Sequence, residues 1–176
     1  MKRLTTKLTL LIALLTGSHA CAADGGYLFV TFKGEHMPLT EQIYFALSPD
    51  GRQLAVVIPA IGNLRLLDSH TGAVRWDKKH PRIRLTPTNH FVAFSPSGNL
   101  LVTAGQDRGS DLTVWCVATG QAIKRLRGHA SFVNGAAFAA DGSLRSWSAD
   151  GTIRVWDLDT GVAKRVISLM PPPEGT

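Results

Sequence analysis

The spacing of short turn signals constrains this chain more than any other feature of its sequence. Ser-Pro-Asp-Gly begins at Ser48, Ser-Pro-Ser-Gly begins at Ser95, and Ala-Asp-Gly begins at Ala140. The glycines of these turns, at positions 51, 98 and 142, lie 47 and 44 residues apart. A Thr-Gly turn follows each of them, with its glycine at position 72, 120 or 161. Two turn types that hold register over such a period indicate an internal repeat with three units.

Each unit is predicted to contain four strands. Gly or Asp turns between apolar runs predict tight hairpins, because these turns need a positive φ that both residues tolerate. The expected strands are 43–47, 54–58, 64–67 and 73–77 in the first unit, 91–94, 100–104, 112–117 and 122–126 in the second, and 132–138, 144–148, 152–158 and 162–168 in the third. An earlier apolar run at 27–32 offers one more strand. The sequence therefore predicts an all-β chain of antiparallel four-stranded sheets.

The third unit carries the most complete motif. It opens with Gly128-His129 and closes with Trp156-Asp157. Gly-His at the start and Trp-Asp at the end of a four-stranded unit are the signature of a WD repeat. On these residues the chain resembles the WD40 β-propeller family. The resemblance implies that each unit is one propeller blade and that the chain forms a partial β-propeller of about three four-stranded antiparallel blades.

The other two units depart from this pattern. The second has Trp115 but no histidine at the matching place, and Cys116 stands where the aspartate would be. The first has Leu67 in place of the tryptophan. Its stretch from Asp68 to Trp76 is similar to the Asp-x-x-Thr-Gly-x-x-x-Trp pattern of quinoprotein propellers, and its Ser-Pro-Asp-Gly turn is similar to periplasmic propellers of the translocation-protein kind. A fragment of a quinoprotein-type propeller enzyme is therefore the alternative to a WD40 interaction protein.

The WD40 resemblance also implies a buried hydrogen-bond network in the third unit. Its expected members are His129, Ser146 or Ser148, Asp150 and Trp156. The two serines share one face of their strand because strand side chains alternate with a period of two. The same residues suggest a catalytic Ser-His-Asp set. The blade context and the lack of a nucleophile elbow favour the structural interpretation.

The first 22 residues have the layout of a secretory signal peptide. Basic residues precede an apolar run from Leu8 to Thr16, and small residues follow before Cys21. The apolar run is too short to span a bilayer. The sequence predicts a soluble exported protein, with lipidation at Cys21 or an uncleaved anchor as alternatives. The expected division of the chain is 1–22 signal peptide, 23–42 lead-in, 43–80, 81–127 and 128–169 blades, and 170–176 proline-rich tail.

The charge of the chain gives little support to nucleic-acid binding. The formal net charge is +6, and it falls to +3 without Lys2, Arg3 and Lys7. No recognition motif for nucleic acid is present. Basic residues do gather near the expected inter-blade connections, where propellers bind partners. The candidate rim for a protein or peptide partner, acidic in chemistry, consists of Lys78, Lys79, Arg82, Arg84, Arg125 and Arg127. Solvation of an outer edge strand is the simpler use of Arg125 and its neighbour Lys124.

No constellation for catalysis is evident in the sequence. It has no phosphate-binding glycine loop, no metal-ligand spacing among its histidines and no activated-thiol motif. The stretch from Asp107 to Asp111 has two carboxylates but reads as an extended turn and not as a cation cage. We therefore expect an exported, non-enzymatic interaction scaffold with no cofactor and no metal. A truncated product without independent function is a further alternative.

Three blades are too few for a closed ring. Propellers close with about four to eight blades. An open arc would expose a sheet edge and an apolar face where a neighbouring blade should pack. The sequence thus predicts either a truncated propeller or one that completes its ring by assembly with itself or with a partner.

Overall fold

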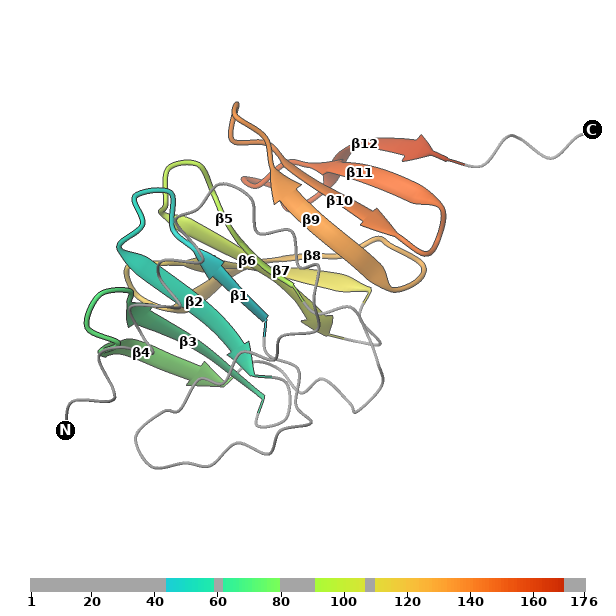
Figure 1. The fold of residues 1–176 in the computed structure, drawn as a ribbon. Helices are drawn as coiled ribbons and strands as arrows, with labels where there is room; N and C mark the ends of the chain where they lie inside the picture. The colour runs from blue at the N-terminus through green and yellow to red at the C-terminus, as the bar shows by residue number, and fades with distance from the viewer. Residues whose placement is uncertain (1–43, 59–61, 80–90, 107–109, 170–176) are drawn as a thin grey trace, which may run out of the picture.

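The computed structural model describes residues 44–58, 62–79, 91–106 and 110–169, and this part of the chain forms three four-stranded antiparallel sheets (Figure 1). The first sheet contains β1 (Tyr44–Leu47), β2 (Gln53–Ile58), β3 (Asn63–Asp68) and β4 (Val74–Lys79). The second contains β5 (Val92–Phe94), β6 (Leu100–Gln106), β7 (Asp111–Cys116) and β8 (Gln121–Leu126). The third contains β9 (Val133–Phe138), β10 (Leu144–Ser148), β11 (Thr152–Trp156) and β12 (Ala163–Ser168). We call these sheets blades 1, 2 and 3.

The prediction of an all-β partial propeller with three antiparallel blades is confirmed. Within each blade the strands follow one another in chain order, and β5 lies between β1 and β9 (Figure 1). The first strands of the blades are therefore neighbours, and blade 2 is the middle blade of an arc. None of the described residues belongs to a helix that would be long and apolar enough to cross a membrane. The proposed signal peptide, Cys21 and the tail lie outside the described residues.

The turn signals form the hairpins for the expected reason. Gly51 and Gly98 both have a φ of 72°, and each donates its N–H to the serine carbonyl three residues earlier at 2.9 Å. A side chain would strain that backbone conformation. The serine hydroxyls close the turns from the other side, since Ser48 Oγ accepts the N–H of Gln53 at 2.9 Å. Local chemistry thus sets where β1 and β5 end.

Apolar side chains fill the spaces between the blades. One leucine recurs at the same place in each blade: Leu54, Leu101 and Leu144 lie opposite Leu67, Trp115 and Trp156, respectively. One core cluster joins blades 1 and 2 and includes Leu66 and Leu101, and another joins blades 2 and 3 and includes Val114 and Leu144. Because alternate residues of β6 point to opposite faces, blade 2 contributes to both clusters.

The outer face of blade 1, which points away from blade 2, is already buried. Val56, Ile58 and Leu67 are only 1%, 0% and 3% exposed. The expectation of a bare apolar face therefore does not hold at this end of the arc. At the opposite end of the arc, Trp147 of blade 3 is 41% exposed.

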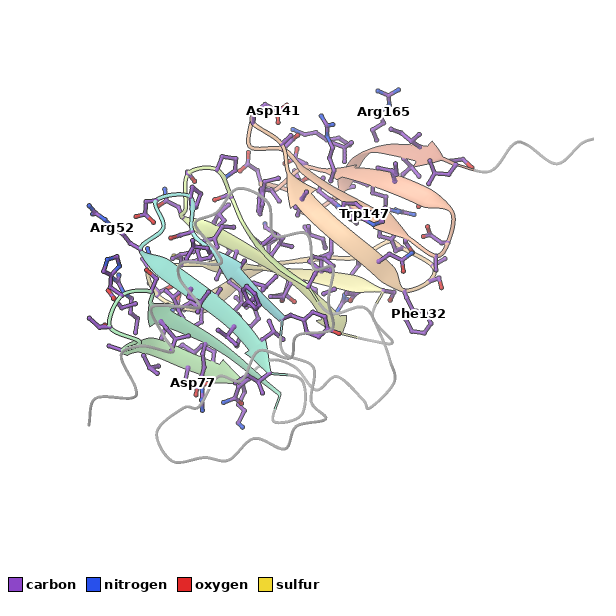
Figure 2. The ribbon with its side chains drawn as sticks, in the orientation of Figure 1. Arg52, Asp77, Phe132, Asp141, Trp147 and Arg165 are labelled. Carbon is purple, nitrogen blue, oxygen red and sulfur yellow. The ribbon has the colours of Figure 1, made fainter. Side chains whose placement is uncertain are left out.

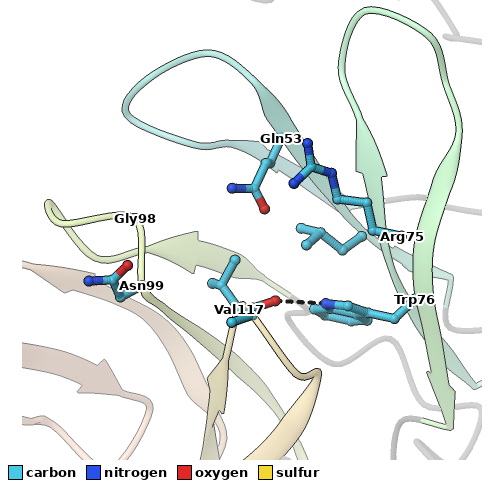
Figure 3. A pocket seen from close by; sticks show the side chains of 8 residues that line it. Gln53, Arg75, Trp76, Gly98, Asn99 and Val117 are labelled. Carbon is cyan, nitrogen blue, oxygen red and sulfur yellow. Dashed lines mark hydrogen bonds between the residues drawn. The ribbon is translucent and has the colours of Figure 1, made fainter.

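One side chain from the last strand of a blade docks on the next blade. Trp76 Nε1 donates a hydrogen bond of 2.7 Å to the carbonyl of Val117 (Figure 3). A Cβ at Gly120 would lie 2.8 Å from the Trp76 ring. Lys124, at the matching place in β8, donates to the carbonyl of Asp159 at 2.8 Å. Trp76, which suggested a quinoprotein, thus has a structural role between blades. Lys124 does not simply solvate an edge strand.

Candidate functional site

The candidate site of blade 3 is a chain of hydrogen bonds that runs from the sheet into the turn between β10 and β11. Trp156 Nε1 lies 2.8 Å from Ser146 Oγ, which lies 2.7 Å from His129 Nε2. His129 Nδ1 lies 2.8 Å from Asp150 Oδ2. Trp156 also meets the His129 ring edge-on, with ring centroids 6.1 Å apart. Four of the five predicted network residues therefore contact one another in series.

The direction of these hydrogen bonds follows from the chemistry of the groups. The indole of Trp156 can only donate and the carboxylate of Asp150 can only accept. With a neutral ring, Ser146 donates to His129 Nε2 while His129 Nδ1–H donates to Asp150. Burial holds the pKa of His129 below its ordinary value, although Asp150 acts in the opposite direction. The neutral ring is thus the form that satisfies every group in the chain.

Asp150 accepts more hydrogen bonds than any other member of the network. Burial alone would raise its pKa, but the hydroxyl of Thr152, the N–H of Ala130 and the ring of His129 together hold the pKa well below its ordinary value. The Thr152 hydroxyl donates at 2.7 Å and the Ala130 N–H at 2.9 Å. The side chain of Asp150 is 8% exposed. Asp150 therefore ties the segment before β9 to the β10–β11 turn.

Of the two serines that the sequence offered, Ser146 bonds to His129 and Ser148 does not. Its hydroxyl donates to the carbonyl of Ser131 at 3.1 Å and accepts the N–H of Asp150 at 3.1 Å. The pairing of β9 with β10 shifts register between Trp147 and Ser148, which moves Ser148 beyond the regular ladder. The two serines were indistinguishable by alternation alone. The irregularity in pairing decides between them.

Ser146, His129 and Asp150 resemble a catalytic triad, but their surroundings give them a structural role. The connection from Ser146 through His129 to Asp150 is the order found in hydrolase triads. However, Ser146 is 0% exposed, and its oxygen accepts the indole N–H of Trp156. No substrate carbonyl can approach an oxygen that is enclosed in this way. The network therefore stabilises the blade.

Gly128 shows why the motif begins with glycine. Its φ is 150°, and a Cβ at this position would lie 2.5 Å from Nη1 of Arg154. The guanidinium is the end of a flexible side chain that can swing away, so the positive φ is what favours glycine at this position. The Gly-His pair lets the chain pass close to β11 before His129 turns inward.

Blades 1 and 2 retain progressively less of this network. In blade 2, Trp115 Nε1 donates to Thr103 Oγ1 at 3.0 Å, and both residues are buried. In blade 1 the corresponding positions are Leu67 and Val56, which belong to an apolar cluster. Sequence reasoning did not single out Thr103, although its place two residues after Leu101 matches that of Ser146 after Leu144. The buried network is thus complete in blade 3, reduced to one hydrogen bond in blade 2 and replaced by apolar packing in blade 1.

The comparisons with known proteins fit this arrangement of blades. The WD40 family, described as "WD domain, G-beta repeat", matches residues 89–115 and 120–157. The matched residues, which run from β5 to β11, are WD40 repeats. The solved structure described as "Structure of U3-55K" superposes on 73% of this chain with a TM-score of 0.62 at 18% sequence identity, which shows a shared fold. This chain spans 40% of the length of that solved chain.

Cys116 occupies the position that an aspartate holds in the other two blades. Asp68 and Asp157 each accept N–H groups of the Thr-Gly turn that follows, with Thr71 N–H and Thr160 N–H at 2.9 and 3.1 Å. In blade 2 the hydroxyl and N–H of Thr119 lower the pKa of the Cys116 thiol in the same way. The printed bond that closes this turn runs between main-chain groups, since the Gly120 N–H donates to the Cys116 carbonyl at 2.8 Å.

The described residues of the basic rim lie at the end of the last strands of blades 1 and 2, beside two carboxylates. Lys79 Nζ donates to Asn63 Oδ1 at 3.0 Å, and Asn63 in turn donates to Asp77. Arg125 and Arg127 both approach Oδ2 of the buried Asp111, at 2.7 and 3.5 Å. Lys78 lies on β4 between Asp77 and Lys79. Arg82 and Arg84 lie outside the described residues.

Metal binding finds no support in the part of the chain that the structure describes. No group of three His, Cys, Asp or Glu side chains comes together there. Asp111, one of the two carboxylates considered for a cation, forms ion pairs with arginines instead. Asp107 lies outside the described residues.

A cleft of about 270 Å³ lies between blades 1 and 2. It is bordered by Gln53, Arg75 and Trp76 on one side and by Asn99 and Val117 on the other (Figure 3).

Proposed function

We propose that this WD40 chain is a non-enzymatic protein-interaction domain that binds an acidic protein or peptide at its basic rim. The observation that supports the proposal is the charge balance at this end of blades 1 and 2. Among the described residues, five cationic side chains lie there beside two carboxylates, Asp77 and Asp111, which leaves three positive charges. The five cations are Arg65, Lys78, Lys79, Arg125 and Arg127.

The carboxylates organise the basic residues of the rim instead of neutralising them. The side chain of Asp111 is 8% exposed, whereas that of Arg127 is 67% exposed. One buried acceptor therefore fixes an arginine that still presents donors to the solvent. Arginine donors in a fixed fork suit carboxylates, which they bind in pairs of hydrogen bonds. An acidic segment lying across the ends of β4 and β8 would meet such donors on both blades.

The proposed role is non-enzymatic because the triad-like residues already have structural partners. Ser146 and His129 are both buried and both bonded within the blade 3 network. The quinoprotein alternative rested on Trp76, whose indole N–H is bonded to Val117. WD40 domains in general mediate contacts between proteins. In this proposal the basic rim selects the partner, and the hydrogen-bond network stabilises blade 3.

Charge reversal at the rim tests this function. The probe is a short synthetic peptide of alternating Glu and Ala, labelled with fluorescein, and the readout is fluorescence anisotropy at low salt. Lys79→Glu combined with Arg127→Glu should weaken binding by about tenfold or more, because attraction becomes repulsion at two exposed positions. Added salt should weaken the parent complex because exposed charges are screened.

The matched control is Arg52→Glu, a charge reversal in the β1–β2 turn at the other end of blade 1 (Figure 2). This variant should bind the Glu-Ala peptide within about twofold of the parent. Equal losses in the control and the rim variants would mean that net charge and not the rim attracts the peptide. Equal affinity of the parent for a Lys-Ala peptide would also refute an acidic partner.

We also propose that the protein is exported. The proposal rests on the order of basic, apolar and small residues in the first 22 positions. N-terminal sequencing and intact mass of the protein from its native host should show loss of at least residues 1–20. A lipid on Cys21 would add to the mass and carry the protein to the membrane fraction. A cytosolic protein that starts at Met1 would contradict export.

A further inference from the structure

The hydrogen-bond network of blade 3 contains a titratable ring that solvent does not reach. The side chain of His129 is 0% exposed, and Ser146, its partner at Nε2, is also fully buried. His129 and Ala130 both bond to Asp150, so the network fastens the segment that leads from β8 into β9. The protonation state of this ring therefore decides how firmly that segment is held on blade 3.

The hydrogen bonds of the network fit only the neutral ring. Ser146 Oγ accepts the indole N–H of Trp156 at 2.8 Å and lies 2.7 Å from His129 Nε2, to which its own hydrogen points when the ring is neutral. A protonated ring carries hydrogens on both nitrogens. Ser146 would then have to accept from Trp156 and from His129 at once, and its own hydrogen would lose its acceptor. Because Ser146 is buried, water does not replace that acceptor.

Among the described residues, two charged groups act on the histidine ring, in opposite directions. Asp150, in the β10–β11 turn, lies 2.8 Å from Nδ1 and favours a cation, whereas the guanidinium of Arg154 on β11 disfavours one. Arg154 reaches the same segment, since a Cβ at Gly128 would lie 2.5 Å from its Nη1. Arg127, which precedes Gly128, approaches Asp111 of β7 at 3.5 Å. Burial, supported by Arg154, outweighs Asp150 and holds the pKa of the ring below its ordinary value.

The contact that joins blades 1 and 2 offers a reference without a titratable group. Trp76 Nε1 donates to the main-chain carbonyl of Val117 at 2.7 Å. A carbonyl acceptor keeps the same form throughout the pH range in which histidine titrates. A change in pH that acts through His129 should therefore affect Trp156 and leave Trp76 as it is.

We propose that His129 is an acid-sensitive switch, whose protonation releases the segment from Arg127 to Ala130 from blade 3. The closed blade holds the ring neutral, whereas the ring of an opened segment takes up a proton near its ordinary pKa of 6.5. The open form therefore binds more protons than the closed form, and a fall in pH favours opening. Asp150 stays charged in both forms above pH 5, because its ordinary pKa is 3.8 and the closed blade lowers it further. Between pH 7.5 and pH 5 the histidine is thus the member of the network that changes charge.

Hydrogen exchange of the tryptophan indole N–H groups tests the proposal, measured by NMR after transfer of the purified full-length protein into D2O at pH 7.5 and at pH 5. Gly128 and His129 both lie against Trp156, so opening of the segment exposes its indole. The Trp156 rate is divided by the Trp76 rate, which removes the pH dependence of the exchange chemistry itself. This ratio should rise several-fold on acidification. The upper limit is about thirtyfold, for a ring that titrates near pH 6.5 when open and stays neutral at pH 5 when closed.

His129→Gln removes the titration and keeps a neutral donor and acceptor on the side chain. The exchange ratio of this variant should no longer depend on pH, whatever its stability. The matched control is His70→Gln, since His70 is an exposed histidine in the turn between β3 and β4. This control should keep the pH response of the parent. A ratio that stays constant in the parent, or that rises equally in His129→Gln, would overturn the proposal.

A titration of the parent alone covers the case in which His129→Gln does not fold. The ring carbon–proton signals of His129 in the folded protein should remain those of a neutral imidazole at pH 6.5, where an ordinary histidine is half-protonated. A ring that is already protonated at that pH in the closed blade would show that burial does not oppose the charge. The switch would then be refuted without any variant.

Discussion

Asp150→Ala should lower the free energy of unfolding by about 1–3 kcal/mol, and by more if the charge of the carboxylate dominates. The substitution removes the acceptor of His129 Nδ1, of the Ala130 N–H and of the Thr152 hydroxyl. The side chain of His129 is 0% exposed, so water cannot replace the acceptor that its Nδ1–H loses. Such a cost is a large share of the stability of a small domain. Chemical denaturation followed by circular dichroism measures it directly.

Asp141→Ala is the matched control for Asp150→Ala. Asp141 also occupies an Asp-Gly turn of blade 3, but it accepts the N–H of Ser143 at 2.9 Å from an exposed position. Its loss should cost about 0.5 kcal/mol or less. The structural interpretation would be untenable if Asp150→Ala were fully stable and had lost a hydrolase activity that the parent possessed. Ser146 and His129 would then be catalytic candidates.

Leu101→Ala should be the most destabilising single truncation between blades 1 and 2, with a loss of about 2–5 kcal/mol. Leu101 is 0% exposed and packs within the cluster that joins the two blades. Removal of its side chain leaves a cavity that the sheets on either side cannot close without moving. Equilibrium unfolding in urea, followed by tryptophan fluorescence and by circular dichroism, gives the loss.

The control for Leu101→Ala is Ile123→Ala, which removes a similar volume from the exposed side of β8. It should change stability by about 0.5 kcal/mol or less. Similar losses in both variants would mean that the inter-blade cluster does not hold the blades together. A loss confined to Leu101→Ala, with both probes reporting one transition, would show that blades 1 and 2 unfold as a unit.

The blade 3 network illustrates what residue types can and cannot predict. His129, Asp150 and Trp156 were predicted from the resemblance of the third unit to a WD repeat, which opens with Gly-His and closes with Trp-Asp. The serine between them was ambiguous. Ser146 and Ser148 alternate identically along β10, and only the shift in pairing at Trp147 and Ser148 separates them.

The rim shows a similar limit for charge. The sequence placed Lys78, Lys79, Arg125 and Arg127 near the ends of two strands, but it did not indicate which carboxylates would face them. Asp111 lies on β7 and meets Arg125 through the pairing of β7 with β8. Asp77 is next to Lys78 on β4, but its partners Asn63 and Arg65 reach it through the pairing of β3 with β4. Ion pairing across a sheet depends on register, which the sequence does not display.

Turn chemistry and alternation determined the strands, the hairpins and the number of blades in this protein, because both are local properties of the chain. Gly51 and Gly98 form their turns through local hydrogen bonds and a positive φ, independently of the packing between blades. Tertiary structure alone decided that the outer face of blade 1 is buried while Trp147 on blade 3 is exposed. The same apolar alternation occurs on both blades, so burial depends on what packs against each face, and that is a property of the assembled arc.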